Sequence, residues 1–255
     1  MVDATFAASG RATKTTPRDA GVLGAASPEP GDRDLSILHL DEHLVAVNKP
    51  PGLLVHRGWA RDGVPALQKL RDQLGRHVYP VHRLDRATSG VLLFAFCSEV
   101  ARDLQRLFEA GAVDKRYLAV CRGHDPSLRR VDHPLAREKG GERRAAVTDF
   151  RLLGHFERYG LYEALPHTGR THQIRRHLKH ASHPIIGDTQ YGKGEHNRLF
   201  RERFQFHHLA LHCQRLAFEH PRRPGRLVIE APLTQELARL LAQLGLLDAV
   251  GERDR

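Results

Sequence analysis

The sequence has few cysteines and no long run of apolar side chains. Cys97, Cys121 and Cys213 are odd in number, lie far apart and form no C-x-x-C pair, which excludes a complete disulfide framework and favours a reducing compartment. The longest apolar run, residues 91–96, has six residues, whereas a membrane-spanning helix needs about 18. The N-terminus lacks the basic start, apolar stretch and cleavage site of a secretory signal. We therefore expect a cytoplasmic protein that does not cross a membrane.

Acidic residues are also outnumbered. The chain has 30 Asp and Glu against 40 Lys and Arg, so its formal charge is +10, and 18 histidines add further hydrogen-bond donors. This excess is typical of proteins that bind polyanions such as nucleic acids, although a basic protein without such a partner has the same composition. The apolar fraction of 40% is enough for a core and excludes a wholly disordered chain.

Residues 1–34 show no apolar periodicity and end in SPEPG, so we expect a disordered leader there. Ordered patterns run from residue 35 to about residue 250 without a linker. The loop at 125–144, rich in Arg, Gly and Glu, is interpreted as a surface excursion. The sequence thus predicts one domain over residues 35–250.

Strand-like patterns outnumber helical ones in this domain. Helices are predicted over 64–74, over 172–181, after a Ser98 cap and after a Thr234 cap. Strands are predicted at 44–48, 79–84, 90–97, 116–122, 147–153, 161–165, 209–218 and 227–231. Because strands and helices do not alternate, the pattern indicates an α+β fold with a mixed, largely antiparallel sheet.

The segment with most chemical information is residues 82–90, HRLDRATSG. It connects two predicted strands, so Asp85 stands in a polar turn where a side chain can be presented. The neighbouring cations Arg83 and Arg86 favour the ionised carboxylate, which could act as a base or a nucleophile. An Asp that only caps the turn would show the same pattern, so both interpretations stay open at this point.

A second segment, residues 166–176, places Gly169 before the start of a helix that is loaded with Arg and His. Free amides and a positive dipole make such a helix end suitable for phosphate. Arg170 and Arg175 could each reach an anion or a carboxylate. A solvated basic face is the alternative.

Other motifs fail on a required residue. Residues 187–193 have the spacing of a phosphate-binding loop, but Gly194 stands where Ser or Thr must hold magnesium. His177, His180 and His183 recur every third residue, yet no Cys pair or HExxH motif accompanies them, so we expect no metal site. Residues 82–85 have the wrong order for a kinase catalytic loop.

Residues 82–93, HRLDRATSGVLL, resemble the signature of the RluA-type family of pseudouridine synthases. Four further motifs occur in a compatible order: NKPPGLLVH at 48–56, KRYLA at 115–119, GRTHQIR at 169–175 and LHCQRLAFEHP at 211–221. The resemblance covers the whole predicted domain. It implies the pseudouridine synthase fold with a single catalytic domain, an isomerase activity on RNA, and no cofactor or metal.

The resemblance also implies roles for individual residues. Asp85 corresponds to the single essential carboxylate, and Arg175 to the arginine that pairs with it. Tyr117 corresponds to the tyrosine that packs on the target base, although its position alone suggests an ordinary sheet aromatic. Leu84 and Ile174 are expected to wall the pocket or simply to pack in the core.

Contacts to RNA are expected from a further set of basic residues. Arg83 corresponds to the residue that enters the RNA stack when the uridine is flipped out. Arg170 and His172 are expected either to contact phosphate or to have a structural hydrogen-bonding role. The remaining expected RNA contacts are Arg86, Lys49 and His56.

A narrower resemblance, at residues 55–59, 71–75, 183–188 and 196–198, is to the TruC branch, which isomerises uridine 65 in the T-arm stem of tRNA. Two alternatives are a ribosomal RNA substrate, as in other branches, and a non-catalytic RNA-binding protein on the same fold. No S4-type RNA-binding domain is recognised, so the catalytic domain itself is expected to supply the RNA affinity. The resemblance further implies a monomer.

Overall fold

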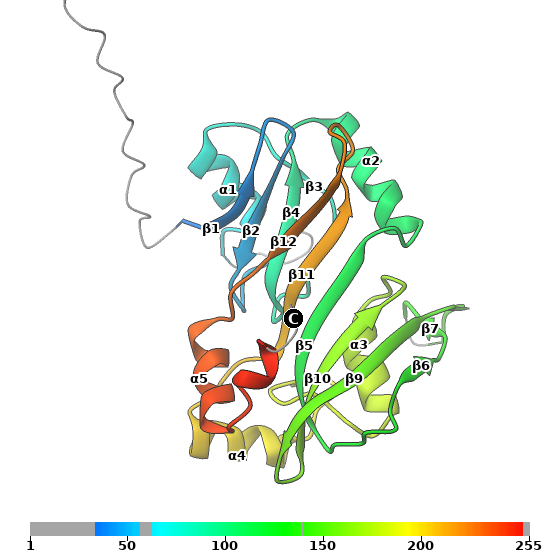
Figure 1. The fold of residues 1–255 in the computed structure, drawn as a ribbon, viewed down its shortest axis with the longest axis vertical. Helices are drawn as coiled ribbons and strands as arrows, with labels where there is room; N and C mark the ends of the chain where they lie inside the picture. Colours follow the sequence, from blue (N-terminus) through cyan, green and yellow to red (C-terminus); the bar gives the residue numbers. More distant parts are fainter. Residues whose placement is uncertain (1–33, 57–62, 139, 252–255) are drawn as a thin grey trace, which may run out of the picture.

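A long mixed sheet runs through the molecule (Figure 1), a computed structural model that describes residues 34–56, 63–138 and 140–251. Within these residues the strands of this sheet follow the order β1-β2-β4-β11-β5-β10-β9-β6, with β12 beside β11 and β3 beside β4. The strands are β1 (Ser36–Leu40), β2 (Leu44–Lys49), β3 (Tyr79–Pro80), β4 (Ser89–Ala95), β5 (Asp114–Arg122), β6 (Arg130–Asp132), β9 (Val147–Phe156), β10 (Tyr159–Pro166), β11 (Leu211–Glu219) and β12 (Arg226–Glu230), and a separate hairpin is formed by β7 (Leu135–Ala136) and β8 (Arg143–Arg144). The helices are α1 (Ala66–Leu74), α2 (Ser98–Glu109), α3 (Gln173–His180), α4 (Gly194–Phe204) and α5 (Gln235–Gln243), followed by the 3-10 turn η1 (Asp248–Val250).

Neighbouring strands pair antiparallel except at one central junction, where β4 and β11 pair parallel. This confirms the predicted α+β class and the largely antiparallel sheet. Every residue of β4, SGVLLFA, is buried. Such a continuous apolar run is what a strand covered on both faces requires.

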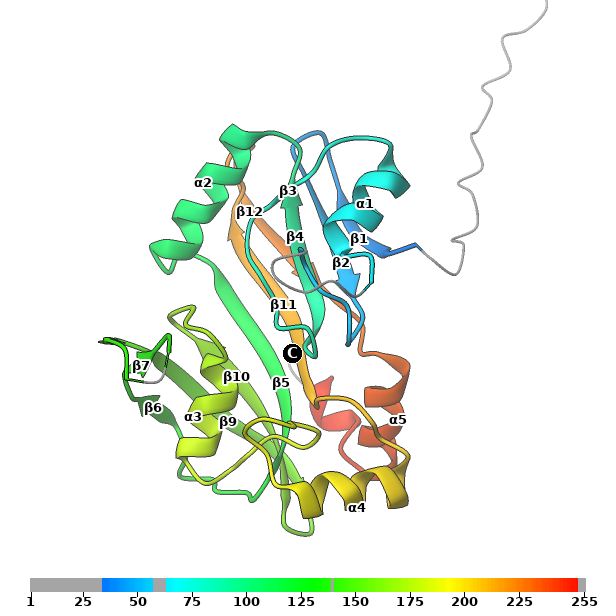
Figure 2. The same cartoon turned by 180° about the vertical axis from the view of Figure 1, so that it is seen from behind.

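Two apolar clusters fill the molecule, one at each end of the sheet. The first gathers buried residues of β2, β4, α1 and α2, and the second those of β5, β10, α3, α4 and α5. The two views of the fold show α1 and α2 at one end and α3, α4 and α5 at the other (Figures 1 and 2). Tyr117 is half-buried and packs against both clusters. The boundary between the clusters therefore passes through β5 at this residue.

The predicted helices are all present, but their ends differ. Thr234 is the N-cap of α5, and its hydroxyl accepts a hydrogen bond from the Leu237 amide at 3.3 Å, which confirms that prediction. The Ser98 cap is wrong: Ser98 is the first residue of α2, and its hydroxyl donates to the Glu99 carboxylate. Helix α4 was not predicted. Its buried residues His196, Phe200 and Phe204 keep helical spacing, but one of them is a histidine and most of their neighbours are polar or charged.

The strand predicted over 79–84 ends early, after Pro80. Residues 81–88 leave the sheet and form the loop that carries Asp85, before β4 begins at Ser89. Strand β1, which was not predicted, pairs with β2 at the edge of the sheet. Within the described part, none of the helices has the length and apolar character that crossing a bilayer requires. The predicted leader at 1–34 lies outside the described residues, apart from Asp34.

Gly90 allows β4 and β11 to approach closely. It pairs with Cys213, has a φ of +109°, and a Cβ at this position would lie 2.1 Å from the Cys213 carbonyl oxygen. Only glycine adopts this conformation without strain, and the approach leaves no room for a methyl group. Because Gly90 follows the loop that carries Asp85, this contact fixes where that loop returns to the sheet.

We predict that Gly90→Ala lowers the free energy of unfolding by about 3 kcal/mol, because it adds both backbone strain and a backbone clash. Denaturant unfolding at neutral pH measures this change. Gly194→Ala is the matched control, because a Cβ at Gly194 meets no atom within 4 Å, and it should change stability by less than about 0.5 kcal/mol. Equal stability of the two variants would contradict the assignment.

Candidate active site

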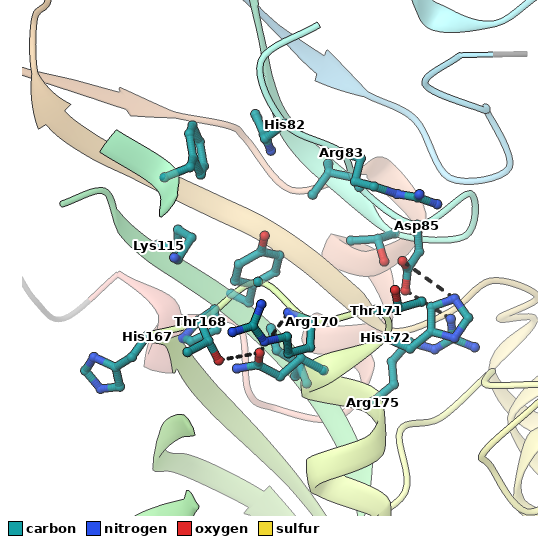
Figure 3. Close-up of a pocket in the computed structure, with 18 of the residues that line it drawn as sticks. His82, Arg83, Asp85, Lys115, His167, Thr168, Arg170, Thr171, His172 and Arg175 are labelled. Atoms are coloured by element: carbon teal, nitrogen blue, oxygen red, sulfur yellow. Dashed lines mark hydrogen bonds and ion pairs between the residues drawn. The ribbon is translucent and has the colours of Figure 1, made fainter. Parts of the chain in front are cut away.

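A cavity of about 510 Å³ opens between the two apolar clusters (Figure 3). Its walls come from segments that are far apart in the sequence. These are the loop at 81–88, the end of α2 with Phe108 and Glu109, strand β5 at Lys115 and Tyr117, the continuous stretch 166–175 that leads into α3, and Leu211 at the start of β11. The parallel pairing of β4 with β11 brings the first of these segments next to the others.

An ion-pair network of three residues lies in the wall of this cavity. Arg175 donates from one terminal nitrogen to Asp85 Oδ2 at 3.0 Å. Its Nε and other terminal nitrogen donate to the two carboxylate oxygens of Asp188, at 2.7 and 2.9 Å. The Asp188 side chain is fully buried, that of Arg175 is 8% exposed and that of Asp85 is 20% exposed. The guanidinium is thus held from behind by one carboxylate and presents its free edge to the other.

The network fixes the charges of its buried members. Burial acts to lower the pKa of Arg175, but the hydrogen bonds from Arg175 to Asp188 and Asp85 outweigh it and raise that pKa. Burial likewise acts to raise the pKa of Asp188, yet Arg175 and the backbone amides of Tyr191 and Gln190 hold it below its usual value. At neutral pH both groups are therefore ionised.

The position of Asp85 at the turn is also set by the backbone. The Asp85 carbonyl accepts a hydrogen bond from the Thr88 amide at 3.0 Å. The side chain of Asp85 points instead to Arg175 and His172 (Figure 3). The turn is therefore closed by the main chain, and the carboxylate is free to face the cavity.

His172 stands on the other side of the same carboxylate. Its Nε2 lies 3.8 Å from Asp85 Oδ1, and its Nδ1 lies 3.0 Å from the hydroxyl of Tyr191. The residue adopts a left-handed conformation, with φ of +54°, at the N-cap of α3. Burial lowers the pKa of His172, which favours a neutral imidazole beside Asp85 at neutral pH.

The start of α3 is held by the Gln173 side chain. Its oxygen accepts from the Thr168 hydroxyl at 2.6 Å and from the Arg170 amide at 3.0 Å, and its nitrogen donates to the Val147 carbonyl and the Thr148 hydroxyl. All four contacts link α3 to the end of β10 and the start of β9. The predicted phosphate-binding helix end is thus a rigid support for Arg175 and His172.

Apolar side chains line the cavity beyond Asp85. Leu84, Ile174 and Leu211 are buried and line it together with the half-buried ring of Tyr117. Burial raises the pKa of Tyr117 well above its usual value, so its hydroxyl is protonated at neutral pH. A flat, uncharged ring can pack against these walls while Asp85 stays at the polar side.

Most of the residues singled out from the sequence meet at this cavity. Those that line it are Asp85, Tyr117, Arg175, Arg83, Arg170, His172, Leu84 and Ile174. Arg86 and His56 do not line it. Arg86 is exposed and donates from Nε to the Gly52 carbonyl at 2.9 Å, and His56 is exposed on the loop after β2.

The expectation that Lys49 contacts RNA is wrong. Its side chain is fully buried, and Nζ donates to the carbonyl oxygens of Pro50, Leu53 and Arg86 at 2.9, 2.9 and 3.1 Å. Burial lowers the pKa of Lys49 to about 7, although Asp85 opposes this shift. Lys49 therefore joins the loop after β2 to the loop that carries Asp85.

Sequence reasoning missed Asp188 as a member of the site. The segment 187–193 has the spacing of a phosphate-binding loop, and residues 183–188 belong to the narrower resemblance, but neither pattern gives Asp188 a role. In the structure this segment is a tight turn. A Cβ at Gly192 would lie 2.2 Å from the Asp188 carbonyl oxygen, and Asp188 accepts from the Gln190 and Tyr191 amides. An acidic residue in a turn rich in glycine was the available signal.

The buried histidines are used by the protein's own hydrogen bonds. His177 contacts the Thr148 hydroxyl and the His133 carbonyl, His196 the Tyr159 hydroxyl, and His212 the Ser89 hydroxyl. In the described ranges, no group of three or more His, Cys, Asp or Glu side chains has a geometry that could hold a metal ion.

We predict that Asp188→Asn lowers the free energy of unfolding by about 3 kcal/mol at pH 7, because it leaves Arg175 short of a buried counter-charge. Since the folded-state pKa of Asp188 lies below its unfolded value, this stabilisation is present above about pH 4 and is lost as the pH falls. The difference in the free energy of unfolding between wild type and variant should therefore become smaller as the pH falls. Denaturant unfolding across pH 3–7 measures it.

Glu157→Gln is the control, because Glu157 pairs with Arg203 on the surface with both side chains about half exposed, and it should cost less than about 1 kcal/mol. A loss for Asp188→Asn that is no larger than this, or that does not depend on pH, would contradict a charged, buried Asp188.

Known proteins resemble this chain over most of its length. A family model described as RNA pseudouridylate synthase matches residues 43–180. The tRNA pseudouridine synthase C of Vibrio cholerae serotype O1 is 44% identical over 234 residues, which cover 83% of this chain and 96% of that protein. The tRNA pseudouridine synthase C of Haemophilus influenzae is 42% identical over 234 residues, covering 83% of this chain and 98% of that protein.

A solved structure gives the same result for the fold. The human RNA pseudouridylate synthase domain containing 4 superposes with a TM-score of 0.70 at 27% identity, covering 82% of this chain and 93% of that chain. The fold expected from the motif resemblance is thereby confirmed. On the matches of family model, relatives and fold, this chain belongs to the RNA pseudouridylate synthase family.

Proposed function

We propose that this protein is a cytoplasmic, monomeric tRNA pseudouridine synthase that isomerises uridine 65 of the T-arm stem without cofactor or metal. Its similarity to proteins named tRNA pseudouridine synthase C supports the choice of tRNA. The observation that carries the proposed chemistry is the Asp85 carboxylate. It faces a partly apolar cavity and is paired with a guanidinium that Asp188 holds from behind.

The reaction is an internal rearrangement. The bond between uracil N1 and ribose C1′ breaks, the base turns, and C5 bonds to C1′. The C5 proton then leaves, and N1 takes up a proton. Nothing is oxidised, and no group arrives from outside. Asp85 has three possible roles: addition to C1′, addition to C6 of the base, or removal of the C2′ proton. In each of them the carboxylate must be held in place, and the hydrogen bond from Arg175 to Asp85 Oδ2 does this.

The cavity must also retain the detached base. Tyr117 is placed to pack on the uracil ring, with Leu84 and Ile174 as apolar walls. Because the base is not covalently held by the ribose while it turns, water in the cavity would compete for C1′. The buried apolar walls reduce this competition. Asp188, the other carboxylate of the network, is fully buried behind Arg175 and is not placed to act as the second acid that a glycosidase needs.

A uridine within a stem reaches this cavity only after flipping out of the helix, which costs a few kcal/mol. Arg83 is exposed at the edge of the cavity, one residue before Leu84. Its planar guanidinium is suited to fill the vacated position in the stack and to offset part of that cost.

Exposed cations around the cavity would hold the RNA backbone. Arg170 is exposed and lines the cavity, and its Nε donates to the Ala145 carbonyl at 3.1 Å, which fixes its direction. His172 is the second candidate at the helix start, and Arg86 and His56 extend the basic surface beyond the cavity. With a net charge of +10, binding should weaken steeply as salt concentration rises.

We predict that Asp85→Asn reduces the release of tritium from tRNA labelled at uridine C5 by about 10⁴-fold, because the amide can neither add to the substrate nor remove a proton. The variant should still fold and bind tRNA. Asp72→Asn, which changes an exposed carboxylate on α1 that pairs with Arg71, should keep full activity. Turnover by a folded Asp85→Asn protein would refute the assignment.

We predict further that cells lacking the gene lose one pseudouridine, at position 65 of tRNA, and that the gene restores it. Carbodiimide treatment followed by primer extension on tRNA and ribosomal RNA locates every affected site. A lost pseudouridine in ribosomal RNA would shift the substrate to that class. No change in either RNA would favour a non-catalytic RNA-binding protein.

A further inference from the structure

Lys115 is a buried cation in the wall of the catalytic cavity that the proposed mechanism does not use. It lies near the start of β5, is 8% exposed and lines the cavity. In the close-up, Lys115 and His82 lie toward one end of the cavity, whereas Asp85, His172 and Arg175 lie toward the other (Figure 3). The cavity thus has a carboxylate at one end and an ammonium at the other.

Among the described residues, the ammonium of Lys115 contacts no negatively charged group. Within the described residues, no hydrogen bond or ion pair reaches its Nζ. The carboxylate of the preceding residue, Asp114, pairs with Arg226 instead. Glu109 also lines the cavity, but its side chain is exposed and forms no ion pair with any described residue. Buried ammonium groups normally have acceptors, because leaving them without any is costly.

His82, at the same end of the cavity, does not supply a negative charge either. Its Nε2 accepts a hydrogen bond from the Leu93 amide at 3.0 Å, so His82 is neutral with its proton on Nδ1. Burial and Lys115 together lower the pKa of His82 to about 3. Burial also lowers the pKa of Lys115, and a more acidic ammonium is a stronger hydrogen-bond donor. The missing acceptor is therefore expected on the substrate.

The position of Lys115 along β5 indicates which part of the substrate it meets. Lys115 and Tyr117 are two residues apart on one strand, so their side chains lie on the same face, about 7 Å apart. A uracil that packs on Tyr117 with its C1′ near Asp85 directs its opposite edge away from Asp85. That edge carries the O4 carbonyl oxygen and the N3 proton, and Lys115 lies in that direction.

We propose that Lys115 is a further catalytic residue, which donates a hydrogen bond to a carbonyl oxygen of the target uracil and stabilises the negative charge that develops there. This inference rests on the proposed function. It does not depend on which of the three roles Asp85 has, because all of them place negative charge on the base.

The movement of the electron pairs shows why each role of Asp85 places negative charge on the base. If Asp85 adds to C1′ or removes the C2′ proton, the bonding pair of the C1′–N1 bond stays with the uracil and is delocalised onto O2 and O4. If Asp85 adds to C6, the pair of the C5–C6 double bond moves toward C4 and places the charge on O4. The charge disappears once C5 has bonded to C1′ and any bond from Asp85 to the base has broken, and it returns when C5 loses its proton, until N1 takes up a proton. A donor fixed at the carbonyl edge lowers the barrier only while that charge exists.

The test compares Lys115→Met and Lys115→Arg with wild type in single-turnover tritium release from tRNA labelled at C5. Loss of one preorganised donor to a developing oxyanion costs about 10²-fold to 10³-fold in rate. We expect a loss of that size for Lys115→Met, with the dissociation constant for tRNA changed less than about threefold. Lys115→Arg keeps the cation and should retain at least about a tenth of the wild-type rate. Lys193→Met, an exposed lysine at the start of α4 that does not line the cavity, should behave as wild type.

Three results would overturn the inference. An unchanged rate for Lys115→Met would show that the ammonium is not needed. Weaker tRNA binding, with a salt dependence reduced by about one counter-ion and an unchanged rate, would assign Lys115 to a phosphate. Equal rate losses in Lys115→Met and Lys115→Arg would indicate a packing role. If thermal unfolding shows that the Lys115→Met protein is not folded, the experiment uses Lys115→Gln in its place. Wild-type protein that modifies no uridine would instead refute the proposed function.

Discussion

The site depends on one buried guanidinium between two carboxylates. Arg175 is held by Asp188 through two hydrogen bonds and offers its remaining edge to Asp85. Removing two charges from water is costly unless each finds a well-aligned partner, and Asp188 provides this compensation where no substrate reaches. The cost of burying Arg175 is thus met inside the protein, and its effect on Asp85 does not require bound RNA.

The rest of the fold brings the members of this network together. Asp85 belongs to the loop before β4, which is part of the first apolar cluster, whereas Arg175 and Asp188 come from the second. The parallel contact between β4 and β11 at Gly90 and Cys213 joins these two parts. Tyr117 packs on both clusters at the same boundary. The cavity is therefore the place where two separately packed halves meet.

Much of this could be predicted from the sequence because it depends on local patterns. The apolar run of β4 and the Thr234 cap of α5 follow from local rules, and five motifs in order pointed to Asp85, Tyr117 and Arg175, which the structure brings to one cavity. The sequence predicts the wrong result where a residue's environment is made by distant segments. Lys49 reads as a surface cation, but the carbonyl oxygens that surround its Nζ come from residues 50, 53 and 86. Asp188 was overlooked for the same reason, since its partner Arg175 lies 13 positions earlier, on another element.

Because Lys49 is buried, dissolved salt should affect RNA binding by the protein but not the loop that carries Asp85. Its ammonium stands where carbonyl oxygens from two loops converge, a place that in other proteins a bound monovalent ion could occupy. Because this ammonium is covalently part of the chain, it cannot dissociate from its site when the salt concentration changes. Dissolved electrolyte will compete with the exposed arginines for the polynucleotide, but it has no access to the ammonium that braces the aspartate loop. Ionic strength should thus change the affinity for RNA. It should leave the positions of the side chains around Asp85 unchanged.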